Sequence, residues 1–183
     1  MNLSTERLQE SRPAKFFFAI ASGENKYLPE AEEMISKKCC PLGPRSELYR
    51  FSDFSDYYDS ETGGEVWKYL VCAEGLMPPE EIVGIKLRVE EIQAQFLVKR
   101  DGRSCRGANI DPGYINGWQV VLATVKNFTQ RIYLGKGVYA ETTLLYQKGK
   151  FQSFPWTYAD YESSLVKDFL KRARDEWRRQ SES

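Results

Sequence analysis

The sequence predicts an α+β fold: a single domain with a mixed sheet, a long C-terminal β-hairpin region and about four helices. The chain has 183 residues, enough for one ordinary domain and too few for two. Segments with helical spacing are interspersed with hairpin-forming strands, which favours α+β layers over a regular doubly wound sheet. No internal repeat or long linker divides the chain. We therefore expect a flexible N-terminus over residues 1–13 and one domain over residues 14–183.

The first half of the domain is expected to contain a strand, a helix, two strands and a second helix. Residues 15–21 (KFFFAIA) form a continuous apolar run, which is typical of a buried strand. Residues 27–38 carry apolar side chains at helical spacing, and segments 47–51 and 66–73 are predicted strands. The clearest helix follows Pro78-Pro79, with an apolar stripe at Ile82, Ile85, Val89, Ile92 and Phe96.

Two elements in the middle of the chain depend on local turn signals. The run 109–114 is predicted to be a strand that ends in a Pro-Gly turn, with Asp111 capping the amides of that turn. Residues 116–119 (NGWQ) have the form of a capping box, so we predict a short helix over residues 118–125. A strand over the same residues is the alternative, because β-branched residues favour strands.

The stretch 130–154 is predicted to be β-structure with a definable register. If Gly135-Lys136-Gly137 is a three-residue loop, Leu134 faces Val138 and Ile132 faces Ala140 on one apolar face. A two-residue loop would mix apolar and charged side chains on one face, so the three-residue loop is preferred. An amphipathic helix follows, with its apolar stripe at Leu165, Val166, Phe169, Leu170, Ala173 and Trp177.

Composition excludes several classes of function. Lys and Arg number 26, as do Asp and Glu, so the net charge is zero and nucleic-acid binding is not expected. The chain has no histidine, which excludes imidazole-based triads and metal sites. The phosphate-binding motifs of P-loop and dinucleotide-binding proteins are missing. The first apolar run is too short for a signal peptide or a membrane span, so we expect a cytoplasmic protein with reduced cysteines and no membrane attachment.

Three polar features contain the candidate site residues. Arg131 and Glu141 would lie opposite each other on the second face of the hairpin, beside Tyr133, where they would hold a polar ligand or form a simple cross-strand ion pair. Asp111, at a strand end, would face a ligand or a metal ion if it does not cap its turn. Asp160, near the start of the last helix, is most simply a helix cap.

Several short runs of the sequence carry a family resemblance: Phe54–Tyr58, Ile85–Leu87, Asn109–Ile115, Val121–Thr124, Lys126, Arg131–Leu134, Gly137–Glu141, Trp156–Tyr158 and Asp160–Tyr161. Together they resemble a prokaryotic family, the domain-of-unknown-function family 4416, over nearly the whole chain. The resemblance implies a small cytosolic protein, and it implies no particular activity because none is assigned to the family. Some carry a GTP-binding label, which the missing phosphate-binding motifs do not support for this chain.

The resemblance implies a set of candidate ligand-binding residues without assigning their roles. These are Lys86, Asn109, Asp111, Tyr114, Lys126, Arg131, Tyr133, Glu141, Thr157 and Asp160. The chain also departs from the family pattern. Where the family tends to have Thr-Asn and then a Glu two residues on, this chain has Val89, Glu90 and Gln93, and it has Ala159 where a proline is typical.

We expect a domain that binds a small anionic ligand in a polar pocket, where Asp111 approaches the Arg131–Glu141 face and Lys86 and Lys126 add positive charge. If the protein is an enzyme, acid–base work would fall to Asp111 or Glu141, with a divalent cation as the one cofactor considered. No other cofactor is evident in the sequence. The alternative is a non-catalytic domain that docks a protein partner through its tyrosine-rich surface and basic last helix.

Overall fold

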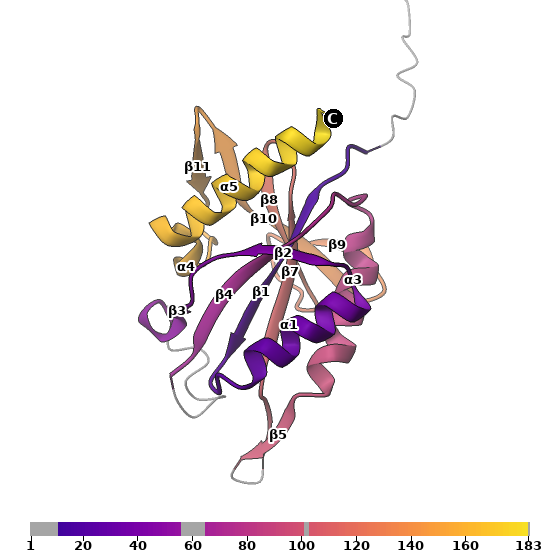
Figure 1. The fold of residues 1–183 in the computed structure, drawn as a ribbon, viewed down its shortest axis with the longest axis vertical. Coiled ribbons are helices and arrows are strands. Elements are labelled where there is room, and N and C mark those ends of the chain that lie inside the picture. The colour runs from indigo at the N-terminus through magenta and orange to yellow at the C-terminus, as the bar shows by residue number, and fades with distance from the viewer. Residues whose placement is uncertain (1–10, 56–64, 101–102, 183) are drawn as a thin grey trace, which may run out of the picture.

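A nine-stranded sheet forms the centre of the protein, with helices packed on both of its faces (Figure 1). The computed structural model describes residues 11–55, 65–100 and 103–182, so most of the predicted flexible N-terminus lies outside the described residues. Every strand pairing within the described ranges is antiparallel. The α+β class predicted from the sequence is confirmed.

The strands of the large sheet are paired in the order β11-β10-β8-β7-β1-β4-β2, with β3 beside β4 and β9 beside β10. They are β1 (Lys15–Ser22), β2 (Leu42–Arg45), β3 (Tyr49–Arg50), β4 (Trp67–Ala73), β7 (Asn109–Ile115), β8 (Gln119–Thr124), β9 (Ile132–Gly135), β10 (Val138–Gln147) and β11 (Lys150–Ser153). The strands β5 (Leu97–Arg100) and β6 (Arg103–Arg106) form a separate hairpin. The helices are α1 (Tyr27–Lys38), the short 3-10 helix η1 (Phe51–Asp53), α3 (Glu81–Ala94), α4 (Ala159–Glu162) and α5 (Ser164–Ser181).

The sheet separates two apolar cores, and strand β1 contributes to both. All eight of its residues are buried. Because successive side chains of a strand point to opposite faces, Phe16 and Phe18 pack against α1 and α3, whereas Phe17, Ala19 and Ala21 pack on the α5 side. Coverage on both faces explains why this segment is a continuous apolar run in the sequence.

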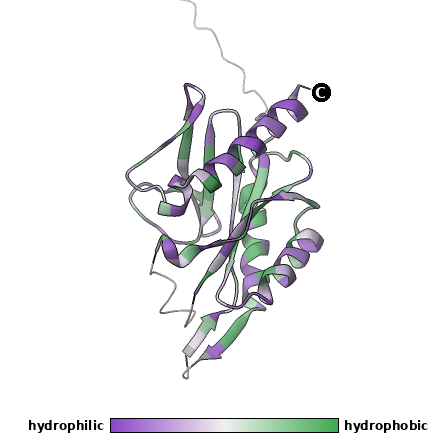
Figure 2. Ribbon diagram, turned by 60° about the vertical axis from the view of Figure 1, so that its left-hand side comes forward, coloured by the Kyte–Doolittle hydropathy of each residue, from purple (hydrophilic) through white to green (hydrophobic). Residues whose placement is uncertain are grey.

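The helices bury the apolar stripes predicted for them. In α3 the stripe from Ile82 to Ile92 lies in the first core, and Phe96, which follows the end of the helix at Ala94, packs in the same core. In α5 the residues with helical spacing from Val166 to Ala173 lie in the second core, and Trp177 is also buried. The outer side of α5 is largely hydrophilic (Figure 2). Among the described helices, none combines the length and apolar composition that a membrane-spanning helix requires.

The helix predicted over residues 118–125 is wrong, and the strand alternative is right. Asn116 does bind the backbone as a cap would: its side-chain oxygen accepts from the amides of Trp118 at 3.1 Å and Gln119 at 3.0 Å. These bonds close the turn between β7 and β8 instead of starting a helix. Strand β8 is apolar on both faces because both cores reach it, which removes the alternation that would identify a strand.

The predicted Pro-Gly turn after Asp111 is also wrong, because β7 continues through Pro112 and Gly113 to Ile115. Strand β7 pairs with β1 from Asn109 onward, but with β8 only from Gly113 to Ile115. Meanwhile β8 stays paired with β10 as far as Thr124. Among the described residues, the first half of β7 therefore has no strand neighbour on its β8 side. We call this opening between Asn109–Pro112 and Ala123–Thr124 the split.

Proline is tolerated in this central strand because of the split. The amide of Ile110 donates to the side-chain oxygen of Gln93 on α3 at 2.8 Å, so it points into the split and away from β1. Amide directions alternate along a strand, so the nitrogen of Pro112 faces the same way. A proline there removes no bond from the ladder with β1. Helix α3 thus supplies through Gln93 the acceptor that β8 does not.

The predicted register of the β9–β10 hairpin holds in part. Ile132 pairs with Ala140 and Tyr133 with Tyr139, but Val138 pairs with Gly135 and not with Leu134, because the register shifts next to the turn. The expected apolar face is also only half buried. Val138 and Ala140 are buried, whereas Ile132 is 70% exposed and Leu134 is 41% exposed, since β9 lies at the edge of the sheet.

Candidate functional site

Arg131 and Glu141 form the ion pair that the register predicts, and it is largely buried. The Arg131 Nε donates to Glu141 Oε2 at 3.1 Å, and the two side chains are 9% and 3% exposed. Arg131 also donates from Nη1 to the backbone oxygen of Lys126 at 2.9 Å. Gln130 donates to the same carboxylate oxygen at 2.7 Å. The guanidinium is therefore held by a carboxylate and a backbone oxygen, and the carboxylate is in turn held by Gln130.

Tyr158 extends this cluster toward the centre of the sheet. Its hydroxyl accepts from Arg131 Nη2 at 3.0 Å. Burial raises the pKa of Tyr158 to about 12; the negative charges of Glu141 and Asp111 act in the same direction, and Arg131 acts against them. The hydroxyl thus stays protonated at neutral pH, close to both acidic side chains.

Asp111 is the accessible carboxylate of the site. It lies on β7 opposite Ala19, on the face of the sheet that α4 and α5 cover, and its side chain is 36% exposed. Asn109 donates to its Oδ2 at 2.9 Å. An exposed carboxylate on a central strand is unusual, since central strands of large sheets are normally covered by helices. Asp111 can therefore accept a hydrogen bond from a molecule in solution.

Lys86 reaches Asp111 from the opposite face of the sheet. It lies on α3, is 4% exposed, and binds Glu90 at 2.8 Å, while its ammonium is 3.9 Å from Asp111 Oδ1. The split explains this contact, because no strand pairing closes the sheet beside Asp111. A buried ammonium lowers the cost of a second negative charge near this carboxylate.

Asp160 is not the helix cap that the sequence suggested. Its carboxylate is fully buried, and its Oδ2 accepts from Lys68 Nζ at 2.7 Å and from the Tyr49 hydroxyl at 2.8 Å. Ser163 caps α5 instead, accepting from the amide of Val166. The ion pair draws Asp160 inward because burial of Lys68 on β4 requires an opposite charge.

Two buried polar atoms beside this ion pair have no hydrogen-bond partner among the described residues. They are the Oδ1 atom of Asp160, an acceptor, and the hydroxyl of Tyr161, a donor. Burial raises the pKa of Tyr161 well above its usual range, and the charges of Asp160 and Asp111 add to this effect. Native proteins rarely leave such atoms unpaired, so these two are suited to binding a polar group.

Four of the candidate residues predicted from the sequence lie outside this cluster or take part only in hydrogen bonds that involve backbone oxygens. Tyr114 packs on the α3 side of the sheet, with its ring 5.7 Å from that of Phe16. Tyr133 is 59% exposed on the edge strand β9. Lys126 contributes its backbone oxygen to Arg131. Thr157 donates to the backbone oxygen of Thr143 at 2.6 Å, which anchors the segment before α4 on a bulge of β10.

The described residues include no group of three or more Cys, Asp and Glu side chains that could hold a metal ion. The four cysteines are unbridged. Burial raises the pKa of Cys40 to about 11 and that of Cys72 to about 12, so both remain thiols at neutral pH and are poor nucleophiles.

Asp111, Arg131 and Glu141 were predicted from the sequence as site residues, whereas Tyr158 and Lys68 were not. The signal for Tyr158 was its place in the Trp-Thr-Tyr run of residues 156–158, next to two selected residues. No signal indicated Lys68, because a lysine in a predicted strand is usually assigned to the exposed face.

Comparisons with known proteins give a family and no activity. A search among curated proteins finds no significant match to the chain. The model of a domain of unknown function, DUF4416, matches residues 12–177. The matched residues extend from just before β1 into the last turns of α5, so they include every residue of the site. The chain therefore belongs to the DUF4416 family.

Proposed function

We propose that this protein binds a small anionic ligand that also carries a hydrogen-bond donor, at the open part of the sheet beside Asp111. The observation that supports it best is convergence: Lys86, Asp111, Tyr158 and the Arg131–Glu141 pair come from separate parts of the chain and meet around one exposed carboxylate. Sites that bind small polar molecules combine a few such groups with apolar surroundings.

The chemistry of the site fits both parts of that ligand. Asp111 is an acceptor for a hydroxyl or amine of the ligand. Arg131 has five N–H groups, and three of them donate to acceptors in the described part of the chain. Its remaining donors favour an anionic group. The charges of Glu141 and Asp160 are already balanced by Arg131 and Lys68, so they oppose the ligand less than free carboxylates would.

The experiment is native mass spectrometry of the gently purified protein, compared with its denatured mass. The wild-type protein is expected to carry a mass excess that denaturation removes, and the excess identifies the ligand. Asp111→Asn is expected to weaken binding of that ligand by at least about tenfold, because it loses one charge-assisted hydrogen bond. Asp175→Asn, an exposed site on α5, is the matched control and keeps binding. An Asp111→Asn protein that binds as the wild type does would contradict the proposal.

The second candidate, protein docking, is favoured by the edge strand β9. Its residues Ile132, Tyr133 and Leu134 are all exposed, and Phe128 just before it is 64% exposed. Exposed apolar edge strands are surfaces to which another chain can add a strand. Under this candidate the native mass equals the denatured mass, and Ile132→Lys abolishes capture of the partner. Under ligand binding, Ile132→Lys leaves the mass excess unchanged.

We also propose a cytoplasmic location, which the unbridged cysteines support because free thiols are usual in reducing compartments. A divalent cation beside Asp111 stays a prediction. Loss of the bound mass on treatment with a chelator would support it.

A further inference from the structure

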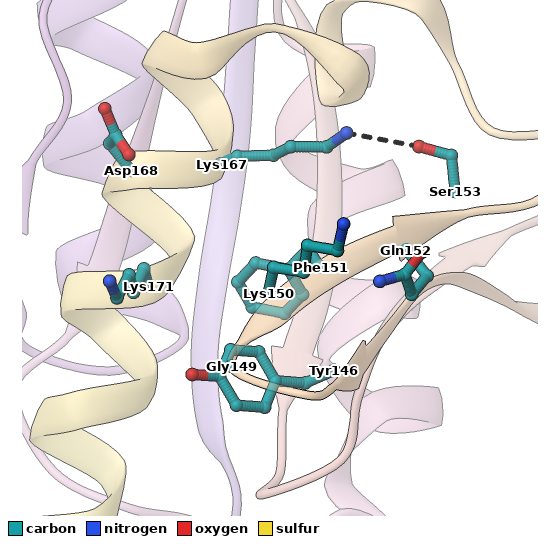
Figure 3. A pocket seen from close by; sticks show the side chains of 9 residues that line it. All are labelled: Tyr146, Gly149, Lys150, Phe151, Gln152, Ser153, Lys167, Asp168 and Lys171. Atoms are coloured by element: carbon teal, nitrogen blue, oxygen red, sulfur yellow. Dashed lines mark hydrogen bonds between the residues drawn. The ribbon is translucent and has the colours of Figure 1, made fainter.

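A cleft lies between the β10–β11 hairpin and α5, and none of the residues that line it belongs to the site beside Asp111. Its volume is about 510 Å³, within the range of small-molecule sites. Strand β11 and its turn line one side and α5 lines the other (Figure 3). The lining residues are Tyr146, Gly149, Lys150, Phe151, Gln152, Ser153, Lys167, Asp168 and Lys171.

The cleft has an excess of positive charge. Lys150, Lys167 and Lys171 line it together with a single carboxylate, that of Asp168. Within the described ranges none of these three lysines forms an ion pair, whereas Lys68 on β4 and Lys86 on α3 are each paired with a carboxylate. Lys167 and Lys171 are also four residues apart on one helix, a spacing at which like charges destabilise the helix. A bound anion would relieve this repulsion.

Lysine side chains from both walls of the cleft extend toward its interior. Lys167 extends from α5 across to β11, where its Nζ donates to the Ser153 hydroxyl at 3.3 Å. Figure 3 shows the ammonium of Lys150 turned toward the same space. The hydroxyl of Ser153 retains a proton that can be donated to a third partner.

An aromatic pair forms the apolar wall of the cleft. The rings of Tyr146 and Phe151 meet edge to face with their centroids 5.1 Å apart, and the guanidinium of Arg174 lies 3.7 Å from the centroid of the Tyr146 ring. Phe151 is buried, which fixes the position of the hairpin against α5. Arg174 itself lies 3.9 Å from the carboxylate of Asp175, so the excess positive charge of the cleft comes from the three lysines. The cationic groups are therefore carried by elements that the core holds in place.

We propose that this cleft binds a small molecule carrying two or more phosphate groups. Lysine ammoniums act as point charges toward phosphate, and hydroxyl donors complete its coordination. A single carboxylate group would satisfy at most one of the lysines, whereas a diphosphate spans Lys150 and Lys167. The cleft shares no residue with the site beside Asp111, so this inference is independent of the proposed function.

The test is isothermal titration calorimetry of the full chain with inorganic pyrophosphate, and separately with orthophosphate. Pyrophosphate is expected to bind more tightly, because it carries more charge and spans both walls. The double variant Lys150→Gln/Lys167→Gln is expected to weaken pyrophosphate binding by at least about tenfold, since two charge-assisted bonds are lost.

The matched control is Lys38→Gln/Lys99→Gln, which removes the same charge from exposed lysines on α1 and β5. Binding that falls equally in both double variants would show a general electrostatic effect and overturn the proposal. The absence of pyrophosphate binding by the wild-type protein at millimolar concentration would overturn it as well. Retained binding in the control with loss in Lys150→Gln/Lys167→Gln would support it.

Discussion

Asp160→Ala is expected to lower the free energy of unfolding by about 3–5 kcal/mol, the largest effect of a single polar substitution in this protein. Asp160 is fully buried and Lys68 is nearly so, and the two are joined at 2.7 Å. Removing the carboxylate leaves an ammonium in the apolar core without its counter-charge, and it also removes the acceptor of the Tyr49 hydroxyl. Urea denaturation followed by circular dichroism measures the change.

Two variants make this result specific to the ion pair. Asp168→Asn, on the exposed side of α5, is expected to change the free energy of unfolding by less than about 0.5 kcal/mol. Adding Lys68→Met to Asp160→Ala is expected to recover part of the lost stability, because the cost arises from the unpaired ammonium. A loss below about 1 kcal/mol for Asp160→Ala, a value typical of exposed ion pairs, would show that the pair is hydrated.

Gly113→Ala is expected to lower the free energy of unfolding by about 3 kcal/mol, the upper end of the usual cost of adding a methyl group to a well-packed core. A methyl group at this position would lie 2.5 Å from the backbone oxygen of Val121 and 2.7 Å from Cζ of Phe17. Neither atom can move easily, because the first belongs to strand β8 and the second to a fully buried ring. The substitution would force β7 and β8 apart where they are paired.

Gly75→Ala is the matched control, since a methyl group there meets no atom within 4 Å. Thermal unfolding of the two variants beside the wild-type protein makes the comparison. Equal melting temperatures for Gly113→Ala and Gly75→Ala would contradict the close approach of β7 and β8 at Gly113.

The sequence predicted correctly those elements whose spacing of apolar residues is compatible with only one type of secondary structure. In α3 and α5 a polar face and an apolar face alternate with the helical period, so the burial of Ile85 or Phe169 follows directly. Strand β8 could not be assigned this way, because two cores cover it and its turn uses Asn116 as a helix would. The hairpin β5–β6 carries a two-residue Asp-Gly signal at 101–102, residues that lie outside the described ranges, and its strands were not predicted from the sequence.

For the candidate site as well, the sequence could predict only those contacts that follow from local structure. The pairing of Arg131 with Glu141 follows from the local register of one hairpin, so the sequence was sufficient to predict it. The contact of Lys86 with Asp111 requires a helix and a strand that are distant in sequence and an opening between two central strands. Local propensities carry no information about such an opening. The proline at 112 was interpreted as a turn because a central strand ordinarily excludes proline.

The split also determines how rigidity is distributed in this protein. Across it, the half of the sheet built on β1 and the half built on β10 are connected by only a short ladder, while α3 contacts β7, β8 and β10 together. Helix α3 therefore holds the two halves of the sheet together across the split. Deuterium exchange at the amide of Ile110 reports whether α3 is docked, because its acceptor is Gln93 and not a strand. A molecule that binds beside Asp111 would lie over the split, on the face of the sheet opposite to α3.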